Sequence, residues 1–477
     1  MIDVRRIFRN KIVLFTSSRY LGYGLQFARG ILIAKFMGPE LFGVWGFLML
    51  AQQYLSYTGF GLQYAVTAEL ATKKTSAPDE RSEIIGTALF ITAIISSLLF
   101  FFGLGIQATG FSLFDKYHFN QYVLAICIIV GLYHFQQLFT NIYRVYGKLS
   151  YIAATELLNA IVPLITVLIF KSSPILINIL LGALIISSLV SVLIFLINTP
   201  LKVNIRFNKK HFIRLMAMGI PLLIYYISHQ LIATSGRTVI SSFYTLKEVG
   251  FYSFSNNITT GVLLGINAVS WVFFPNILSR THSGISNDEV IRIVNNINNI
   301  YNTSVFLVVF IVVLISPLIF VILPQYQLAS NSLSILLLAQ AVLSASFGYN
   351  CVAIARKQQM KVASIGGICA VFVAGLSWLI AALEGSFDWI AVAVLAGAFL
   401  YTSLQARLGT KLIGRKVTGF TALNSTISWG SLLGTMILLT GILTGHSFVA
   451  GLIGIIVFVF ANWSQIKLIP KFVNEKS

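Results

Sequence analysis

The chain contains fourteen continuous apolar runs, each near the ~20 residues that a helix needs to cross the hydrocarbon core of a membrane. Because the runs are continuous rather than alternating, they predict helices and not the strands of a membrane barrel. Only 10% of the residues are charged, against roughly 25% in soluble domains. We therefore predict an all-α integral membrane protein. The expected spans are 12–36, 41–70, 84–107, 121–143, 151–170, 175–197, 215–238, 250–275, 298–323, 331–354, 362–383, 389–405, 420–441 and 447–466.

The basic residues lie almost entirely in one set of loops. Of the 33 lysines and arginines, 26 fall in every second connection between the expected spans, 4 in the other connections and 3 within spans. Since cytoplasmic loops are the basic ones, this alternation predicts that both termini are cytoplasmic. The first apolar run continues to about Phe36 without a cleavage pattern, which favours a permanent helix over a signal peptide.

An internal repeat relates the first six expected helices to the next six. Arg29, Glu40 and the pair Asp79–Glu80 have counterparts at Arg237, Glu248 and Asp288–Glu289, in the same order and at nearly constant offsets. The repeats contain an even number of helices and are therefore parallel, and transporters of this kind bind substrate between the two halves near mid-bilayer. The predicted division is 1–200 (helices 1–6), 201–417 (helices 7–12) and 418–477 (helices 13 and 14 with the C-terminus).

Three arginines lie within the expected spans: Arg19, Arg29 and Arg237. A charge at the centre of a membrane helix costs about 2.5–3.5 kcal/mol, so a compensating environment is needed. One such environment is a cationic, water-filled cavity for an anionic substrate; snorkelling of each arginine to the headgroups is the alternative. For the neutral amides, the alternative is interhelical hydrogen bonding. The predicted substrate-binding residues are Arg19, Arg29, Arg237, Gln26, His229, Gln52, Gln53, Asn256 and Asn257.

Glu69, His134 and Glu156 are candidates for ion coupling. Both glutamates lie close to expected cytoplasmic helix ends, so an interfacial position is the alternative for them. For His134 the alternative is a packed, hydrogen-bonded role. The three cysteines lie in apolar runs without metal-ligand spacing, and neither a metal nor a cofactor is predicted.

Two segments carry a family pattern, namely Arg29-Gly-Ile-Leu-Ile-Ala-Lys-Phe-Met-Gly-Pro-Glu-Leu-Phe-Gly and Arg237-Thr-Val-Ile-Ser-Ser-Phe-Tyr-Thr-Leu-Lys-Glu-Val-Gly-Phe-Tyr. In each segment, an arginine lies late in one helix and is followed by a short turn that contains a glutamate. The next helix then begins with an aromatic residue and a glycine. This pattern resembles the polysaccharide transporter family, which includes the O-antigen flippases, of the multidrug/oligosaccharidyl-lipid/polysaccharide (MOP) exporter superfamily.

The resemblance implies two six-helix bundles that form a V, alternating access, and a location in the bacterial inner membrane. It implies that an undecaprenyl-diphosphate-linked anionic oligosaccharide moves from the cytoplasmic to the periplasmic leaflet, with arginines lining the lumen at Arg29 and Arg237. The implied partners are this lipid-linked glycan, membrane lipids and a polysaccharide polymerase, with no nucleic acid. The related lipid II flippases carry lumenal arginines on helices 1, 2 and 8, whereas expected helices 2 and 8 have none here, which argues against a peptidoglycan precursor.

Other function classes fit the sequence less well. No nucleotide-binding Gly-x-x-x-x-Gly-Lys-Ser/Thr run is present, so any driving force comes from an ion gradient, the membrane potential or product consumption. A multidrug or cation efflux antiporter is the main alternative, but cations favour carboxylates and the first expected helix has none. A glycan polymerase or ligase would need catalytic groups on a sizeable outer loop. We therefore predict a protein that is not an enzyme.

Overall fold

The computed structural model describes residues 11–72, 78–111, 114–199, 205–263, 287–414 and 419–474. Its secondary structure is helical in all of these ranges, with no strand among them. The chain forms two compact units, Met1–Ile224 (unit 1) and Tyr225–Ser477 (unit 2). The predicted division at residues 200 and 417 stays a prediction.

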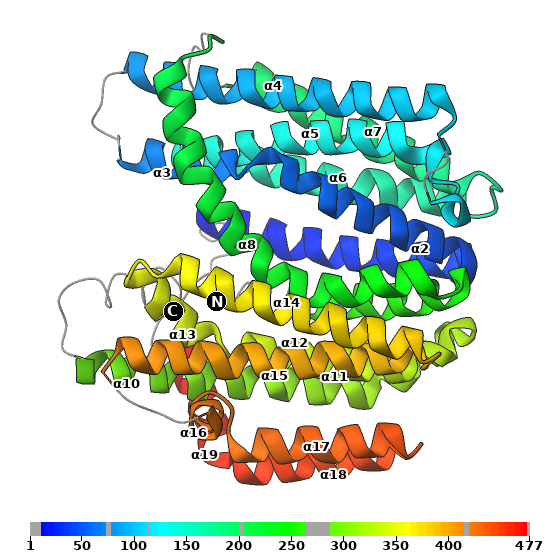
Figure 1. Cartoon of the computed structure of the whole chain (residues 1–477), viewed down its shortest axis with the longest axis vertical. Helices are drawn as coiled ribbons and strands as arrows, with labels where there is room; N and C mark the ends of the chain where they lie inside the picture. Colours follow the sequence, from blue (N-terminus) through cyan, green and yellow to red (C-terminus); the bar gives the residue numbers. More distant parts are fainter. Residues whose placement is uncertain are drawn as a thin grey trace, which may run out of the picture. The chain divides into compact units, whose positions relative to one another are not determined.

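Unit 1 is built from long helices that run alongside one another (Figure 1). Helix α4 packs against α5, α2 against α6, and α5 and α6 both pack against α7. The elements are α2 (Lys11–Ser56), η1 (Tyr57–Gly59), α3 (Leu62–Thr72), α4 (Pro78–Thr109), η2 (Asp115–Tyr117), α5 (Phe119–Val145), α6 (Leu149–Ile169), α7 (Leu176–Ile197) and the first part of α8 (Lys209–Phe243).

Unit 2 contains the rest of α8 and a second set of helices, in which α15 packs against both α12 and α14. The elements that follow α8 are the helix of residues 246–263, α10 (Asn287–Ile297), η3 (Asn298–Asn302), α11 (Thr303–Ile322), η4 (Pro324–Ala329), α12 (Ser330–Ser344), α13 (Phe347–Ala355), α14 (Gln359–Ala382), α15 (Phe387–Leu412), α16 (Gly419–Asn424), α17 (Trp429–Leu443), α18 (Ser447–Ala461) and α19 (Trp463–Asn474).

The first two expected spans meet without a loop. Helix α2 has 46 residues and would measure about 69 Å at 1.5 Å per residue, more than twice the ~30 Å core of a bilayer. Its backbone is not helical at Gly38, where φ is 68°, and Pro39 follows. A left-handed φ suits glycine, and proline suits the first turn of a helix. Gly38 and Pro39 therefore divide α2 into two crossings, between the predicted limits of 36 and 41.

The corresponding corner of unit 2 uses side chains. The Thr245 amide donates to Glu248 Oε2 at 2.9 Å, and the Glu248 amide donates to Thr245 Oγ1 at 3.3 Å. This reciprocal pair is a capping box, which satisfies backbone donors at the start of the helix 246–263. The glutamate of the second family segment therefore has a structural role in this corner.

Several helices differ from their expected spans. The expected span 41–70 is interrupted at η1, after which Phe60 and Gly61 both have positive φ values, of 48° and 69°. Span 331–354 divides between α12 and α13, and span 298–323 begins in the π-helical turn η3. Part of span 250–275 lies outside the described residues. Polar or apolar composition alone did not indicate these interruptions.

The two C-terminal membrane helices are shorter than expected. Helices α17 and α18 have 15 residues each, about 22 Å, whereas the spans 420–441 and 447–466 predicted a full crossing. Ser428 accepts a hydrogen bond from the Ser431 amide and thereby caps α17 nine residues after the expected start. Helix α18 ends before Asn462, and α19 begins at Trp463.

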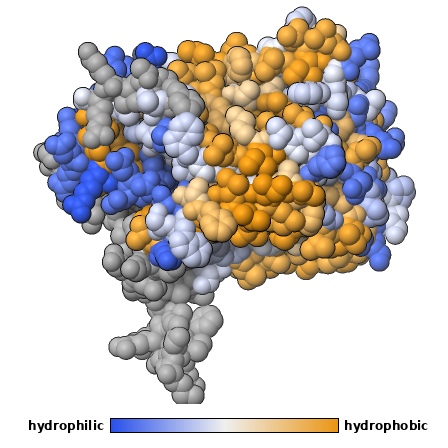
Figure 2. Space-filling model, turned by 90° about the horizontal axis from the view of Figure 1, so that it is seen from below, coloured by the Kyte–Doolittle hydropathy of each residue, from blue (hydrophilic) through white to orange (hydrophobic). Residues whose placement is uncertain are grey.

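Large apolar side chains cover the outside of the helices. Leu98, Phe101 and Phe460 are 64%, 65% and 80% exposed. Figure 2 shows one face of the molecule with an apolar band between hydrophilic margins. In water such a surface would promote association, whereas lipid tails cover it at little cost. Ten described helices are long and apolar enough to cross a membrane, so the chain is an all-α, multi-pass membrane protein as predicted.

Candidate functional site

Arg19 and Arg29 form a polar stripe on α2, and both contact α6 within unit 1. Arg19 Nε lies 3.4 Å from Glu156 Oε2, and the two side chains are 22% and 28% exposed. Both α2 and α6 begin at the same end of the unit. Arg19 lies eight residues and Glu156 seven residues from these starts, or about 10–12 Å along each helix. The sequence therefore indicated the depth of both residues, but not that they form an ion pair.

A second arginine approaches this pair from α5. Arg144 lies in the last turn of α5 and interacts electrostatically with Arg19 and Glu156. Tyr23, one turn after Arg19 on α2, belongs to the same cluster, and the Arg19 guanidinium carbon lies 5.7 Å from the centre of its ring. We call Arg19, Tyr23, Arg144 and Glu156 the inner cluster.

Arg29 lies ten residues further along α2 and contacts the next turn of α6. Its Nη1 donates to the carbonyl oxygen of Asn159 at 3.4 Å, and Asn159 Oδ1 in turn accepts from Ser191 of α7 at the same distance. Arg29 Nε is shielded from solvent and has no hydrogen-bond partner among the described residues. A buried donor without a partner is unusual and is consistent with a ligand that supplies the acceptor.

These residues form a cationic face on unit 1. Three guanidinium groups, of Arg19, Arg29 and Arg144, are accompanied by one carboxylate, that of Glu156. Guanidinium groups stay charged in proteins and bind carboxylates and phosphates with planar, often bidentate, hydrogen bonds. Within this set the guanidinium groups outnumber the carboxylate by three to one, so the face can accept an anion.

The remaining predicted polar residues of α2 lie elsewhere along the helix. Gln26 is partly buried between Arg19 and Arg29. Gln52 and Gln53 are partly buried in the second crossing, where Gln53 Nε2 donates to the Tyr57 hydroxyl at 3.3 Å. This bond links the end of α2 to the first residue of η1.

Glu69 forms an ion pair with Arg214 of α8 and is 2% exposed. The neighbouring His211 lies 3.3 Å from Glu83 of α4. The backbones also touch near these pairs. A Cβ added to Gly61, just before α3, would lie 2.2 Å from the carbonyl oxygen of Gly219 in α8. Together these contacts hold the start of α8 to unit 1, and Glu69 lies apart from the α2–α6 face.

His134 of α5 packs against the interruption of the second crossing. Its Nε2 lies 3.1 Å from Thr58 Oγ1, and Thr58 donates its hydroxyl proton to the Leu55 carbonyl. Thr58 can then only accept from the imidazole, so Nε2 is the protonated nitrogen. A Cβ on Gly59 would lie 2.8 Å from His134 Nδ1. His134 therefore holds the broken turn in place.

The predicted residues of unit 2 lie on α8 and on the helix 246–263. The His229 ring packs edge-to-face on Tyr401, with ring centres 5.5 Å apart. Arg237 is partly buried and interacts electrostatically with Tyr252. Asn256 and Asn257 are partly buried on the helix 246–263, and the Asn256 carbonyl accepts from Thr260.

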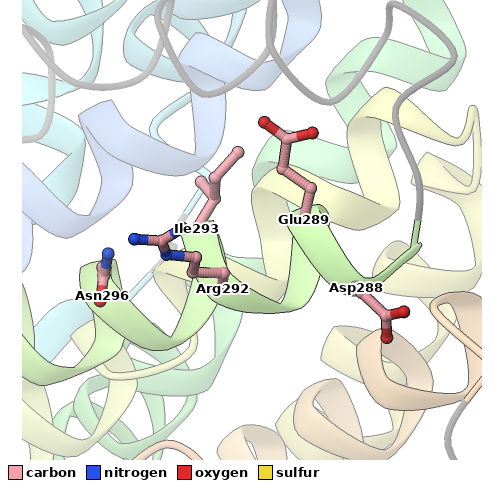
Figure 3. Close-up of a pocket in the computed structure, with 5 residues that line it drawn as sticks. All are labelled: Asp288, Glu289, Arg292, Ile293 and Asn296. Atoms are coloured by element: carbon pink, nitrogen blue, oxygen red, sulfur yellow. The ribbon is translucent and has the colours of Figure 1, made fainter.

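A pocket outside these groups lies along α10. Its lining residues are Asp288, Glu289, Arg292, Ile293 and Asn296. Figure 3 shows the carboxylates of Asp288 and Glu289 pointing in different directions, so they do not form an acid pair. Acidic residues in the first turn of a helix are favoured by its dipole, which gives both a structural role. None of the predicted site residues lines this pocket.

Sequence reasoning missed Arg144 and Asn159. Arg144 was counted among the loop residues, because the span was expected to end at residue 143, whereas α5 continues to Val145. Asn159 lies three residues after Glu156 and therefore on the same face of α6, a spacing that could have indicated it. Both are polar residues on helices that pack against α2, and this property could have identified them.

The sequence matches one known family. Residues 7–282, more than half of the chain, match the sequence model described as polysaccharide biosynthesis protein. No curated protein matches the chain in sequence.

Solved structures of MOP-superfamily transporters have the same fold. The lipid II flippase MurJ, in an inward closed conformation, matches with a TM-score of 0.69 at 14% identity, covering 97% of this chain and 99% of that chain. An inward-facing multidrug resistance transporter of the MATE family and MOP superfamily matches with a TM-score of 0.65 at 13% identity, covering 82% and 94%. An outward-facing conformation of such a transporter matches with a TM-score of 0.55 at 13% identity, covering 88% and 96%.

Proposed function

Because the chain belongs to the polysaccharide biosynthesis protein family and has the fold of MOP-superfamily transporters, we propose that it is a flippase. It moves an oligosaccharide repeat unit linked to undecaprenyl diphosphate, such as an O-antigen unit, from the cytoplasmic to the periplasmic leaflet of the bacterial inner membrane. The protein performs no covalent chemistry on the glycan, and a polysaccharide polymerase uses the product.

The observation that supports this proposal is the excess of arginine over acid on the α2–α6 face. Among the described residues, Arg29 donates to one carbonyl oxygen and its Nε has no hydrogen-bond partner, while Arg19 and Arg144 share Glu156. An isolated positive charge in a membrane helix is costly, and an anionic headgroup that binds there lowers this cost. A diphosphate suits guanidinium donors because it offers several acceptor oxygens.

The spacing of the arginines favours a path over a single pocket. Arg19 and Arg29 are ten residues apart on one face of α2, about 15 Å along the helix. A diphosphate is shorter than this distance, so the two arginines contact it in succession. In this proposal the headgroup meets the inner cluster first and Arg29 second, while the polyprenyl tail stays in lipid. Alternating access then exposes the headgroup to the periplasm, with Arg237 as the contribution of unit 2.

A genetic experiment tests the proposal. In the double variant Arg29→Ala with Arg237→Ala, surface glycan should disappear and lipid-linked oligosaccharide should accumulate in the inner leaflet, while the amount of protein in the membrane is unchanged. Arg206→Ala is the matched control, because Arg206 is exposed near the start of α8. Normal surface glycan in the double variant would contradict the assignment of these arginines.

Efflux of drugs or cations is the alternative function, since the fold is shared with MATE transporters. A cation would require exposed carboxylates, yet Glu156 is paired with Arg19, and Glu69 is paired with Arg214 and almost fully buried. Expression of the protein in a drug-sensitive strain separates the two functions. Ion-dependent drug resistance that survives Arg29→Ala would favour efflux.

A further inference from the structure

Glu156 stands out because it is the acid that accompanies the arginines of the α2–α6 face. Its carboxylate contacts Arg19 at 3.4 Å and interacts with Arg144 as well. About a quarter of the Arg19 and Glu156 side chains is exposed, so a ligand can contact part of each side chain, although Arg19 Nε and Glu156 Oε2 themselves are shielded from solvent. A paired charge of this kind gives little net stability once the cost of desolvation is included.

We propose that Glu156 is an internal counter-ion, which occupies Arg19 and Arg144 until the diphosphate of the substrate displaces it. This proposal rests on the flippase function above and goes beyond it by assigning the control of affinity to one residue. A carboxylate and a phosphate use the same donors of a guanidinium, so they compete for the same atoms of Arg19.

Competition of this kind would allow the bound substrate to be released. A site with Arg19 and Arg144 alone would hold a diphosphate tightly and release it slowly. With Glu156 present, the site is neutralised in part before binding, and the displaced carboxylate repels the bound phosphates at close range. Glu156 therefore weakens binding and speeds release.

The charges of the inner cluster agree with this role. Arg19, Arg144 and Glu156 carry a net charge of +1, so the site still attracts an anion. Tyr23 adds a neutral ring beside Arg19, with its centre 5.7 Å from the guanidinium carbon. Arg29, with its partner on the backbone of Asn159, has no competing acid among its described contacts and can accept the headgroup next.

A binding experiment separates this role from a purely structural one. Farnesyl diphosphate is titrated calorimetrically into the detergent-purified full chain, its Glu156→Gln variant and the control Glu83→Gln, in which the glutamate beside His211 is changed. Glutamine keeps the size of the side chain but removes the charge. We expect Glu156→Gln to bind about tenfold more tightly than the unmodified protein, which corresponds to about 1.4 kcal/mol, and Glu83→Gln to bind as the unmodified protein does.

A structural role predicts the opposite result. If Glu156 only positions Arg19, the Glu156→Gln variant binds equally or less well, and the proposal is overturned while the flippase function stands. Farnesyl phosphate in place of the diphosphate should show a smaller gain. If neither protein binds the diphosphate, the counter-ion role is wrong, and the glycan export of the Arg29 and Arg237 double variant decides the flippase function separately. Thermal unfolding of each variant verifies that it is folded.

Discussion

The two units differ in the interactions that their polar groups make inside the membrane helices. Unit 1 buries charges: Arg19 pairs with Glu156, and Glu69 pairs with Arg214. In unit 2 two buried amides, those of Asn298 and Asn302, donate to backbone carbonyls. The bonds are those of Asn298 to Ser425, and of Asn302 to Ala345 and Thr426.

This difference indicates which polar residues hold the helices together and which are available to a substrate. An interhelical hydrogen bond from a neutral side chain is worth about 0.6–2 kcal/mol in a membrane and carries no standing electrostatic cost. A charge costs more and needs a reason to be retained. The amides of unit 2 fasten the segment before α17 to the π-turn η3 and to the end of α12, whereas the arginines of unit 1 remain able to bind an anion.

The largest effect should come from breaking the charge pair of unit 1. Arg19→Gln removes the guanidinium that pairs with Glu156 at 3.4 Å and leaves Arg144 as the remaining arginine of the inner cluster, so the free energy of unfolding should fall by about 2–3 kcal/mol. This value is discounted from the ~3–5 kcal/mol of fully buried pairs, because the pair is partly exposed. Thermal unfolding in detergent measures the change.

The double variant Arg19→Gln with Glu156→Gln sharpens the comparison. It replaces the ion pair by two amides, the chemistry of unit 2, and should regain most of the stability without regaining diphosphate binding. Equal loss of stability in the single and double variants would show that Arg19 is retained for packing alone.

A smaller effect is expected at the amides of unit 2. Asn302→Leu removes two hydrogen bonds, to Ala345 and Thr426, and should lower the free energy of unfolding by about 1–2 kcal/mol. Glycan export per folded molecule should remain unchanged, as measured by surface glycan normalised to the protein in the membrane. A loss of export in a stable Asn302→Leu protein would break the comparison, because the amides of unit 2 would then contribute to transport and not only to assembly.

The smallest effect concerns the two corners of the repeat. Glu248→Ala removes the capping box with Thr245 and should cost about 0.5–1 kcal/mol, whereas Glu40→Ala should cost less, because Gly38 and Pro39 form that corner with the backbone. Chemical unfolding of the two variants under identical conditions gives the difference. Equal costs would mean that the capping box contributes nothing to the corner of unit 2.

The sequence predicted the helices better than their contacts. Hydropathy located the membrane segments and the corner at Gly38, because a span must be long, apolar and ended by residues such as glycine and proline. The interruption at Tyr57–Gly61 was not predicted, since these residues are no less apolar than their neighbours, and the π-turn η3 likewise has no distinctive composition.

The candidate site was predicted in part. Arg19, Gln26 and Arg29 were predicted to bind substrate because they are polar residues of the first expected span, but the sequence could not identify what lies opposite them. The partners Glu156 and Asn159 belong to α6, far away in the sequence, and their contact depends on how α2 packs against α6. Arg237, His229, Asn256 and Asn257 remain predictions for the substrate site, as does ion coupling through Glu69, His134 and Glu156.

The most direct test of the central claim is transport in a defined membrane. The purified chain is reconstituted in vesicles with a fluorescent glycan linked to a polyprenyl diphosphate, and a membrane-impermeant quencher reports which leaflet holds the label. We predict that the unmodified protein moves the label between leaflets, that Arg29→Ala lowers the rate to that of empty vesicles, and that Asn302→Leu leaves the rate unchanged. Transport by the folded Arg29→Ala protein at the unmodified rate would contradict the account.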